Sequence, residues 1–268
     1  MDLGENLQNA WNYTRQMTAD LGRWIILIIL GVIPIVNFIL IGYMGRVVKE
    51  APNGDSPPRL ERYGELWVKG LKIFLAFLVY MLVPLIIVAV GVIAFIAPLS
   101  GLAGAAPWGR RFTPGYTWWP MGLMGGVGGG LILIGVIVAI ALAVIAVIGI
   151  VHMVKSDQFV KAFAFGEIIE IIRKIGYGKY ILWLIVVIVI HVVYGAIGNI
   201  PGIGWLITLV LNPPFLVFIS RSMGLVYEEH RQTVRAPQQL GGEPNYCIQC
   251  GSPLPSGSLF CPKCGAKQ

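Results

Sequence analysis

Five long apolar segments constrain this chain more than any other feature of its sequence. They lie at residues 24–48, 73–97, 131–154, 180–197 and 205–227. A helix needs about 20 apolar residues to cross the roughly 30 Å hydrocarbon core of a bilayer. Composition agrees, because only 12% of the 268 residues are charged, against roughly 25% in soluble domains. We therefore expect an all-α integral membrane helix bundle of about five spans over residues 24–227.

Proline interrupts three of these segments, at Pro34, Pro84 and Pro213–Pro214. Each proline removes an intrahelical hydrogen bond, so these spans are expected to kink. The first segment has two possible forms. A full span over 24–48 is favoured, and a re-entrant hairpin bent at Pro34 is the alternative.

Basic residues alternate between the connecting segments. The first connection carries Lys49, Arg59, Arg62, Lys69 and Lys72, and the third carries Lys155, Lys161, Arg173, Lys174 and Lys179. The second connection, 98–130, has only Arg110 and Arg111. Because Lys and Arg collect on the cytoplasmic side, the net charge of +7 indicates topology. We predict a multi-pass plasma-membrane protein whose C-terminus is cytoplasmic.

Two amphipathic segments flank or join the spans. Residues 1–23 lack the order of a secretory signal and predict an N-terminal interfacial helix with Leu7, Ala10, Trp11 and Thr14 on one face. Residues 157–175 predict a second interfacial helix, with Asp157 as its N-cap. Docking of a partner is the less favoured use of this second helix.

The spans contain few groups that could carry chemistry. None of the thirteen acidic residues falls inside an apolar segment, which weakens a proton- or sodium-coupled transporter. His191, Asn212 and Asn37 form a possible intramembrane polar site, although a neutral imidazole bonded across helices is the favoured interpretation of His191. No nucleophile–base pair or carboxylate dyad is evident, so we do not expect an enzyme.

The strongest motif lies at the C-terminus. Cys247, Cys250, Cys261 and Cys264 are all the cysteines of the chain, and they form two C-x2-C pairs. Four thiolates at this spacing predict a closed structural Zn²⁺ site in a ribbon over residues 246–268, after a polar linker at 228–245. About 23 residues cannot bury a sufficient core, so the metal would supply the folding energy. Disulfides and rubredoxin-like iron are the weaker alternatives.

Two resemblances follow from particular residues. The stretch from Phe260 to Lys267 resembles the small zinc ribbons appended to many prokaryotic membrane proteins. Residues 5–230 resemble a largely archaeal, uncharacterised membrane family known as domain of unknown function 4013. The matching stretches are Ala10 to Thr14, Ile41 to Tyr43, Phe163 to Ile168 and Phe218 to Arg221. Neither resemblance implies an activity or catalytic residues.

These features favour one function over two others. We expect a membrane protein that presents a cytoplasmic zinc ribbon for protein interaction or scaffolding. The alternative is a channel or transporter for a small or lipidic solute, because broken helices line transporter sites. Lys263 and Lys267 are too few for a convincing phosphate-binding surface, so nucleic acid is not an expected partner. The small residues Gly135, Ala139 and Ala143 predict close packing, either within the bundle or in a homo-oligomer.

Overall fold

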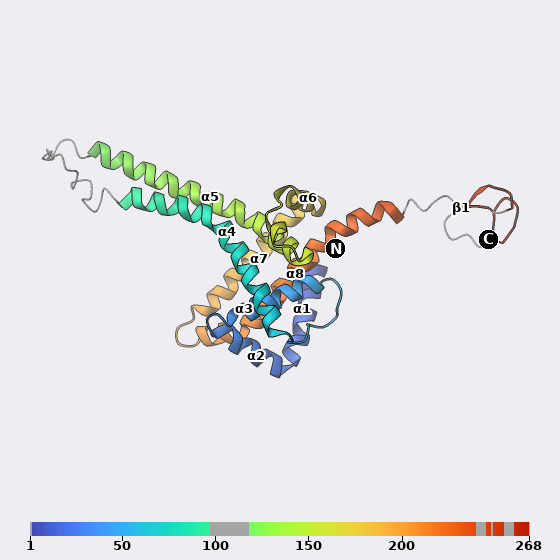
Figure 1. Cartoon of the computed structure of the whole chain (residues 1–268), viewed down its shortest axis with the longest axis horizontal. Coiled ribbons are helices and arrows are strands. Elements are labelled where there is room, and N and C mark those ends of the chain that lie inside the picture. The colour runs from blue at the N-terminus through green and yellow to red at the C-terminus, as the bar shows by residue number, and fades with distance from the viewer. Residues whose placement is uncertain (1, 97–117, 240–244, 248, 255–259, 268) are drawn as a thin grey trace.

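The computed structural model describes residues 2–96, 118–239, 245–247, 249–254 and 260–267, and it is almost entirely helical (Figure 1). The helices of the described part are α1 (Leu3–Ala19), α2 (Leu21–Val32), α3 (Asn37–Glu50), α4 (Tyr63–Ile96), α5 (Trp118–Ser156), η2 (Phe159–Phe163, a 3₁₀ turn), α6 (Phe165–Ile175), α7 (Tyr177–Gly198) and α8 (Gly204–Gln239). Two short antiparallel strands, β1 (Asn245–Tyr246) and β2 (Pro253–Leu254), follow.

Four helices of the described chain are long and apolar enough to cross a membrane. These segments are Tyr63–Ile96, Gly126–Ser156, Tyr177–Gly198 and Gly204–Arg231. Between 11% and 39% of the residues in their apolar windows are buried inside the bundle. Their remaining Ile, Val and Leu side chains face outward, which is the arrangement expected of helices surrounded by lipid. The all-α membrane fold with a C-terminal ribbon is thus confirmed.

The first apolar segment is not one helix, which differs from the favoured full span over 24–48. Helix α2 has 12 residues and rises about 18 Å, too short for a bilayer core of roughly 30 Å. The chain turns at residues 33–36, where Ile35 has a positive φ of 69°. The Trp67 indole donates to the Ile35 carbonyl at 2.9 Å and satisfies one backbone acceptor of the turn. The segment therefore divides at Pro34 into α2 and α3, and the re-entrant path that the sequence left open stays a prediction.

The other prolines do not end their helices. Helix α4 continues through Pro84 and α8 continues through Pro213 and Pro214. Figure 1 shows that α4 changes direction along its length and then runs beside α5. The expectation of spans that bend without breaking holds for α4.

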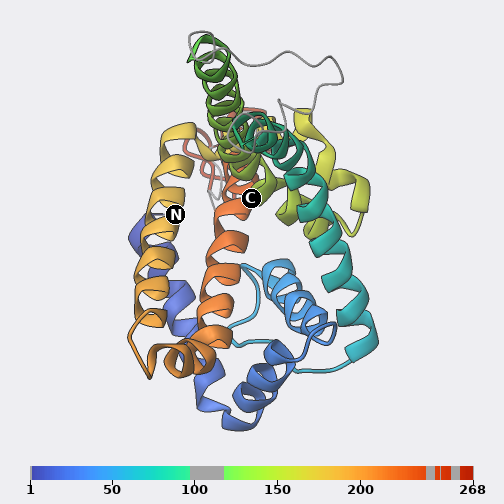
Figure 2. The same ribbon diagram turned by 90° about the vertical axis from the view of Figure 1, so that its left-hand side faces the viewer.

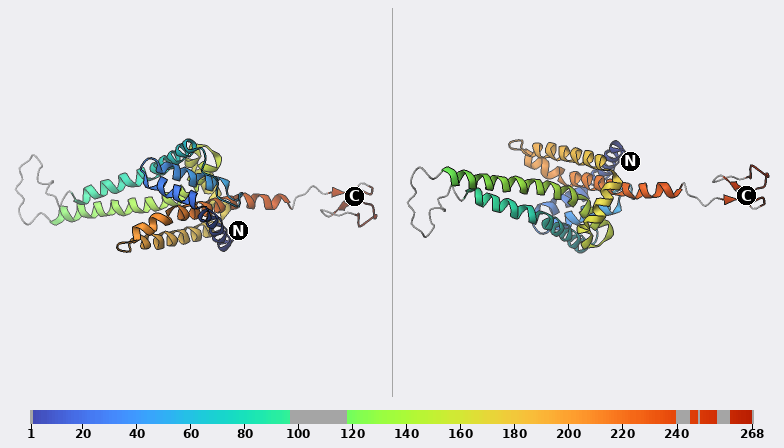
Figure 3. Two further views of the ribbon diagram at one scale, coloured as in Figure 1. Left: turned by 90° about the horizontal axis from the view of Figure 1, so that it is seen from below. Right: turned by 90° about the horizontal axis from the view of Figure 1, so that it is seen from above.

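Helices α4 and α5 form a long pair that extends away from the rest of the bundle (Figure 3). Glycine allows their close approach. A Cβ placed on Gly128 would lie 2.5 Å from the Phe95 amide nitrogen, and one on Gly135 would lie 2.6 Å from Val88. Gly135, the first residue of the predicted small-residue stripe, therefore packs within this chain.

Helix α1 packs along α8, as the views in Figures 1 and 2 agree. Asp2 caps it through a capping box completed by Glu5. The buried face includes Ala10 and Thr14 as expected, but Trp11 is 58% exposed. Tyr13 and Met17 are also buried against the bundle, and contact of the exposed Trp11 with the membrane surface stays a prediction.

Two predicted boundaries differ from the structure. Asp157 is not an N-cap: it has a positive φ of 56° after the end of α5, and the segment 157–175 divides into η2 and α6. Helix α8 continues to Gln239, well into the predicted linker at 228–245. In the first turn of this extension, Glu228 and Glu229 are buried against the bundle and form ion pairs with Lys155 and Lys179.

Candidate functional site

The C-terminal ribbon contains two equivalent turns, one for each cysteine pair. In the first, Cys247 N–H donates to Ser252 and Gly251 N–H donates to Cys247, both at 2.9 Å. In the second, Cys261 N–H donates to Ala266 and Gly265 N–H donates to Cys261, both at 2.8 Å. Each turn needs a positive φ, 67° at Gly251 and 73° at Gly265, which glycine adopts without strain.

The two turns bring the four cysteine sulfurs within 4.8 Å of one another. The Cys247–Cys264 sulfurs are 3.5 Å apart and the Cys250–Cys261 sulfurs are 3.6 Å apart. A tetrahedral zinc with bonds of about 2.3 Å would place its sulfurs ~3.8 Å apart. Donor set and spacing therefore fit zinc, and the four predicted ligand residues lie together.

Neighbouring polar groups favour a thiolate at Cys261. The Ser252 hydroxyl lies 3.3 Å from its sulfur, and this contact is the main cause that lowers the pKa of Cys261 to about 6. The Lys263 backbone N–H also donates to this sulfur at 3.4 Å. Four protein ligands complete a tetrahedron, so a metal held here would have a structural role.

Two aromatic side chains project from equivalent positions of the ribbon. Tyr246 precedes the first cysteine pair and Phe260 precedes the second, and each is 59% exposed. Aromatic residues of this kind are enriched at the centres of protein interfaces.

The predicted intramembrane polar residues each have separate neighbours. The His191 Nδ1 atom lies 2.8 Å from the Val187 carbonyl oxygen of the same helix, and the His191 ring packs edge-to-face on Phe215. Asn212 lies near Gly31 of α2, and Asn37 begins α3. No hydrogen bond joins any two of His191, Asn212 and Asn37 in the described structure, so a shared site for these three residues stays a prediction.

A different polar group lies where α8 leaves its apolar stretch, and Arg221 is at its centre. Arg221 is 2% exposed, and its guanidinium donates to the carbonyls of Pro52 at 2.8 Å and Asn53 at 3.2 Å. It also donates to the Asn9 side chain at 3.1 Å and lies 4.4 Å from the ring centroid of Tyr13. Arg221 thus connects α1 and the segment after α3 to α8.

Ser222 and Glu228 extend this group on both sides. The Ser222 hydroxyl donates to the Asn6 side chain at 2.5 Å and accepts from the Trp183 indole at 2.8 Å. Glu228 pairs with Lys155 of α5 at 2.8 Å, with side-chain exposures of only 10% and 5%. We call this group the buried polar cluster; its members are Asn6, Lys155, Arg221, Ser222 and Glu228.

Sequence reasoning missed this cluster because it placed Glu228 in a solvated linker and did not consider Arg221, inside the segment 205–227, as a buried charge. A signal was present, however. Arg221 and Glu228 are seven residues apart, about two helical turns, and therefore share a face of α8. Val217, four residues before Arg221, is fully buried on that face. Helical periodicity carried past the last apolar residue would have placed both charges inside the bundle.

Comparison with known proteins agrees with these two parts. A family model described as a protein of unknown function (DUF4013) matches residues 25–203, and a zinc-ribbon domain model matches residues 246–268. No curated protein and no solved structure matches the chain. The first match covers well over half of the 268 residues. The family resemblance is thus confirmed over residues 25–203 and the zinc-ribbon resemblance over residues 246–268.

Proposed function

Because the chain belongs to the DUF4013 family and ends in a zinc-ribbon domain, we propose that it is a non-enzymatic membrane protein that presents the ribbon to a cytoplasmic protein partner. The helix bundle anchors the ribbon at the plasma membrane. Cys247, Cys250, Cys261 and Cys264 hold the zinc, which supplies the folding energy of the module. The exposed rings of Tyr246 and Phe260 make the contact with the partner.

One observation carries the proposal: the metal site is closed while the aromatic surface beside it is open. All four positions of a tetrahedral metal are taken by cysteine sulfurs that lie within 4.8 Å of one another. Tyr246 and Phe260 are each 59% exposed although they adjoin that site. This combination supports recognition of a protein surface rather than metal-based catalysis.

The distribution of charge supports a cytoplasmic location of the ribbon. Lys49 and Lys155 belong to the basic connecting segments, and Lys155 pairs with Glu228 at the end of the last membrane-type stretch. The chain after Glu228 therefore leaves the bundle at the same end as the basic segments. By the positive-inside tendency this end faces the cytoplasm.

Partner capture with four forms of the protein tests the proposal. The full-length chain is compared with a chain ending at Gly242, with Y246A/F260A and with K263Q/K267Q, after metal analysis has shown that the last two retain zinc. We expect one partner set on the full-length and K263Q/K267Q proteins and its loss from the other two. Identical partner sets on the full-length and shortened chains would refute the interaction role, and loss only with K263Q/K267Q would indicate a phosphate-rich partner.

Transport of a lipidic solute is the second candidate, and one cavity favours it. A cavity of about 280 Å³ lies between α1, α7 and α8 and is lined by Trp11, Tyr194, Pro214 and Phe215. Its lining is almost wholly apolar, which suits a hydrocarbon chain better than a polar solute. Flux of a fluorescent lipid across reconstituted vesicles, with and without F215A, tests this candidate; equal flux in both would contradict it.

A further inference from the structure

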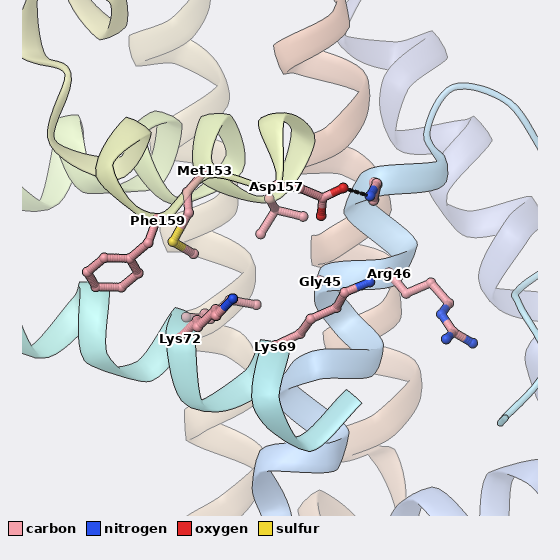
Figure 4. A pocket seen from close by; sticks show the side chains of 10 residues that line it. Gly45, Arg46, Lys69, Lys72, Met153, Asp157 and Phe159 are labelled. Atoms are coloured by element: carbon pink, nitrogen blue, oxygen red, sulfur yellow. Dashed lines mark hydrogen bonds and ion pairs between the residues drawn. The ribbon is translucent and has the colours of Figure 1, made fainter. Parts of the chain in front are cut away.

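A second cavity lies at the opposite side of the bundle, where α3, α4, α5 and η2 meet. Its volume is about 70 Å³, several times the ~10–15 Å³ that one water requires. Figure 4 shows that Lys69 and Lys72 of α4 lie on one side, with Met153 and Phe159 above Lys72. The lining combines four basic side chains and one carboxylate, Asp157, with apolar side chains.

This basic cavity lies at the boundary between the uncharged and charged parts of two membrane-type helices. The uncharged stretch of α4 begins at Ile73, directly after Lys72, and the uncharged stretch of α5 ends at Val154, directly before Lys155. Ile73 and Val154 both line the cavity. At such a boundary the helices pass from the hydrocarbon core to the level of the lipid headgroups.

The basic groups around the cavity exceed their acidic partners. Lys49 pairs with Asp157, and Lys69 pairs with Glu65 at 2.6 Å. Arg46 also lines the cavity and donates to the Arg59 carbonyl, although Figure 4 shows its guanidinium pointing away from Lys72.

Lys72 has no hydrogen bond or ion pair within the part of the chain that the structure describes. Lys72 is therefore the cation of this lining that lacks a carboxylate partner in the described chain, because Arg46 points away from the cavity and interacts with Glu50. Its positive charge remains uncompensated beside an apolar surface.

From this arrangement we propose that the basic cavity binds the phosphate of an anionic membrane lipid. The ammonium groups of Lys72 and Lys69 contact the phosphate oxygens, which accept hydrogen bonds from them. The first part of the acyl region lies against Ile73, Met153 and Phe159. A basic pocket between membrane helices at headgroup level has the chemistry that such lipids require.

Lipid retention measured by native mass spectrometry tests this proposal on the full-length protein. The protein is released from nanodiscs that contain phosphatidylcholine with increasing phosphatidylglycerol, and bound phosphatidylglycerol is counted for the wild type, K72Q, K72R and R173Q. Arg173 is an exposed basic residue of α6 outside the cavity, so R173Q is the matched control. We expect K72Q to weaken retention of phosphatidylglycerol about fivefold, equivalent to ~1 kcal/mol for one basic group. K72R and R173Q are expected to retain as much phosphatidylglycerol as the wild type.

A second pair of measurements separates a lipid from free phosphate. Binding of a lipid requires that F159A weaken retention and that millimolar inorganic phosphate fail to displace the bound phosphatidylglycerol. Equal retention by K72Q and R173Q would overturn the proposal. Displacement by inorganic phosphate together with unchanged retention by F159A would also overturn it, because the cavity would then be a site for the free anion.

Discussion

Substitution of Glu228 by Gln perturbs the buried polar cluster with almost no change in side-chain volume. Glu228 and Lys155 are 2.8 Å apart, and their side chains are 10% and 5% exposed. E228Q leaves the Lys155 ammonium buried without its anionic partner. Because little water reaches the Lys155 ammonium, the lost ion pair is not replaced by solvation, and the free energy of unfolding falls.

The size of the effect follows from the contacts that remain. Removal of one partner from a buried ion pair typically costs ~3–5 kcal/mol. Lys155 also donates to the carbonyls of Lys49, at 3.2 Å, and Ala51, and the new amide oxygen can still accept. We therefore expect E228Q to lower the free energy of unfolding by roughly 2–3 kcal/mol, less than the typical cost. The double variant K155M/E228Q is expected to lose less, since it leaves no buried charge.

Reversible unfolding of the full-length protein in mixed micelles, followed by tryptophan fluorescence, measures these differences. The matched control is E170Q, because Glu170 pairs with Lys174 at a similar 2.8 Å but is 51% exposed. Exposed pairs contribute at most ~1 kcal/mol, so E170Q is expected to stay close to the wild type. If E228Q and E170Q change the free energy of unfolding equally, the buried cluster does not stabilise the bundle as argued.

Three further predictions concern separate parts of the chain. Chelation of zinc, or C250S, is expected to unfold the ribbon and leave bundle unfolding unchanged; proton NMR of the ribbon resonances beside bundle fluorescence checks this. G42A is expected to destabilise the bundle by ~2–3 kcal/mol, because its Cβ would lie 1.8 Å from the Leu66 carbonyl oxygen, whereas G195A meets no atom within 4 Å. R221K is expected to lower the free energy of unfolding by ~2 kcal/mol, since a single ammonium cannot replace a guanidinium with four contacts. In thermal unfolding, G42A and R221K should each have a lower midpoint than G195A.

The sequence was informative where local physics decides the structure. Uncharged stretches of helical length predicted the membrane helices, since few other structures tolerate them. The cysteine pairs and the glycines after them predicted the ribbon turns, because positive φ at Gly251 and Gly265 is a local requirement. The Glu170–Lys174 pair likewise follows from helical spacing alone.

The rest depended on contacts between distant segments. Whether Pro34 ends a helix or only bends it depends on partners such as Trp67, which satisfies the turn from another helix. The burial of Arg221 and Glu228 depends on acceptors at residues 49–53 and on α1, which lie far away in sequence. The basic cavity is formed by four elements, so no single segment could predict it.

The side of the membrane on which the ribbon lies decides whether it can meet a cytoplasmic partner. Protease protection is measured with a C-terminal epitope tag, in sealed right-side-out vesicles and in sealed inverted vesicles. We expect the tag to be cleaved only in inverted vesicles, where the cytoplasmic face is exposed. Cleavage of the tag in sealed right-side-out vesicles would place the ribbon outside and contradict its presentation to a cytoplasmic partner.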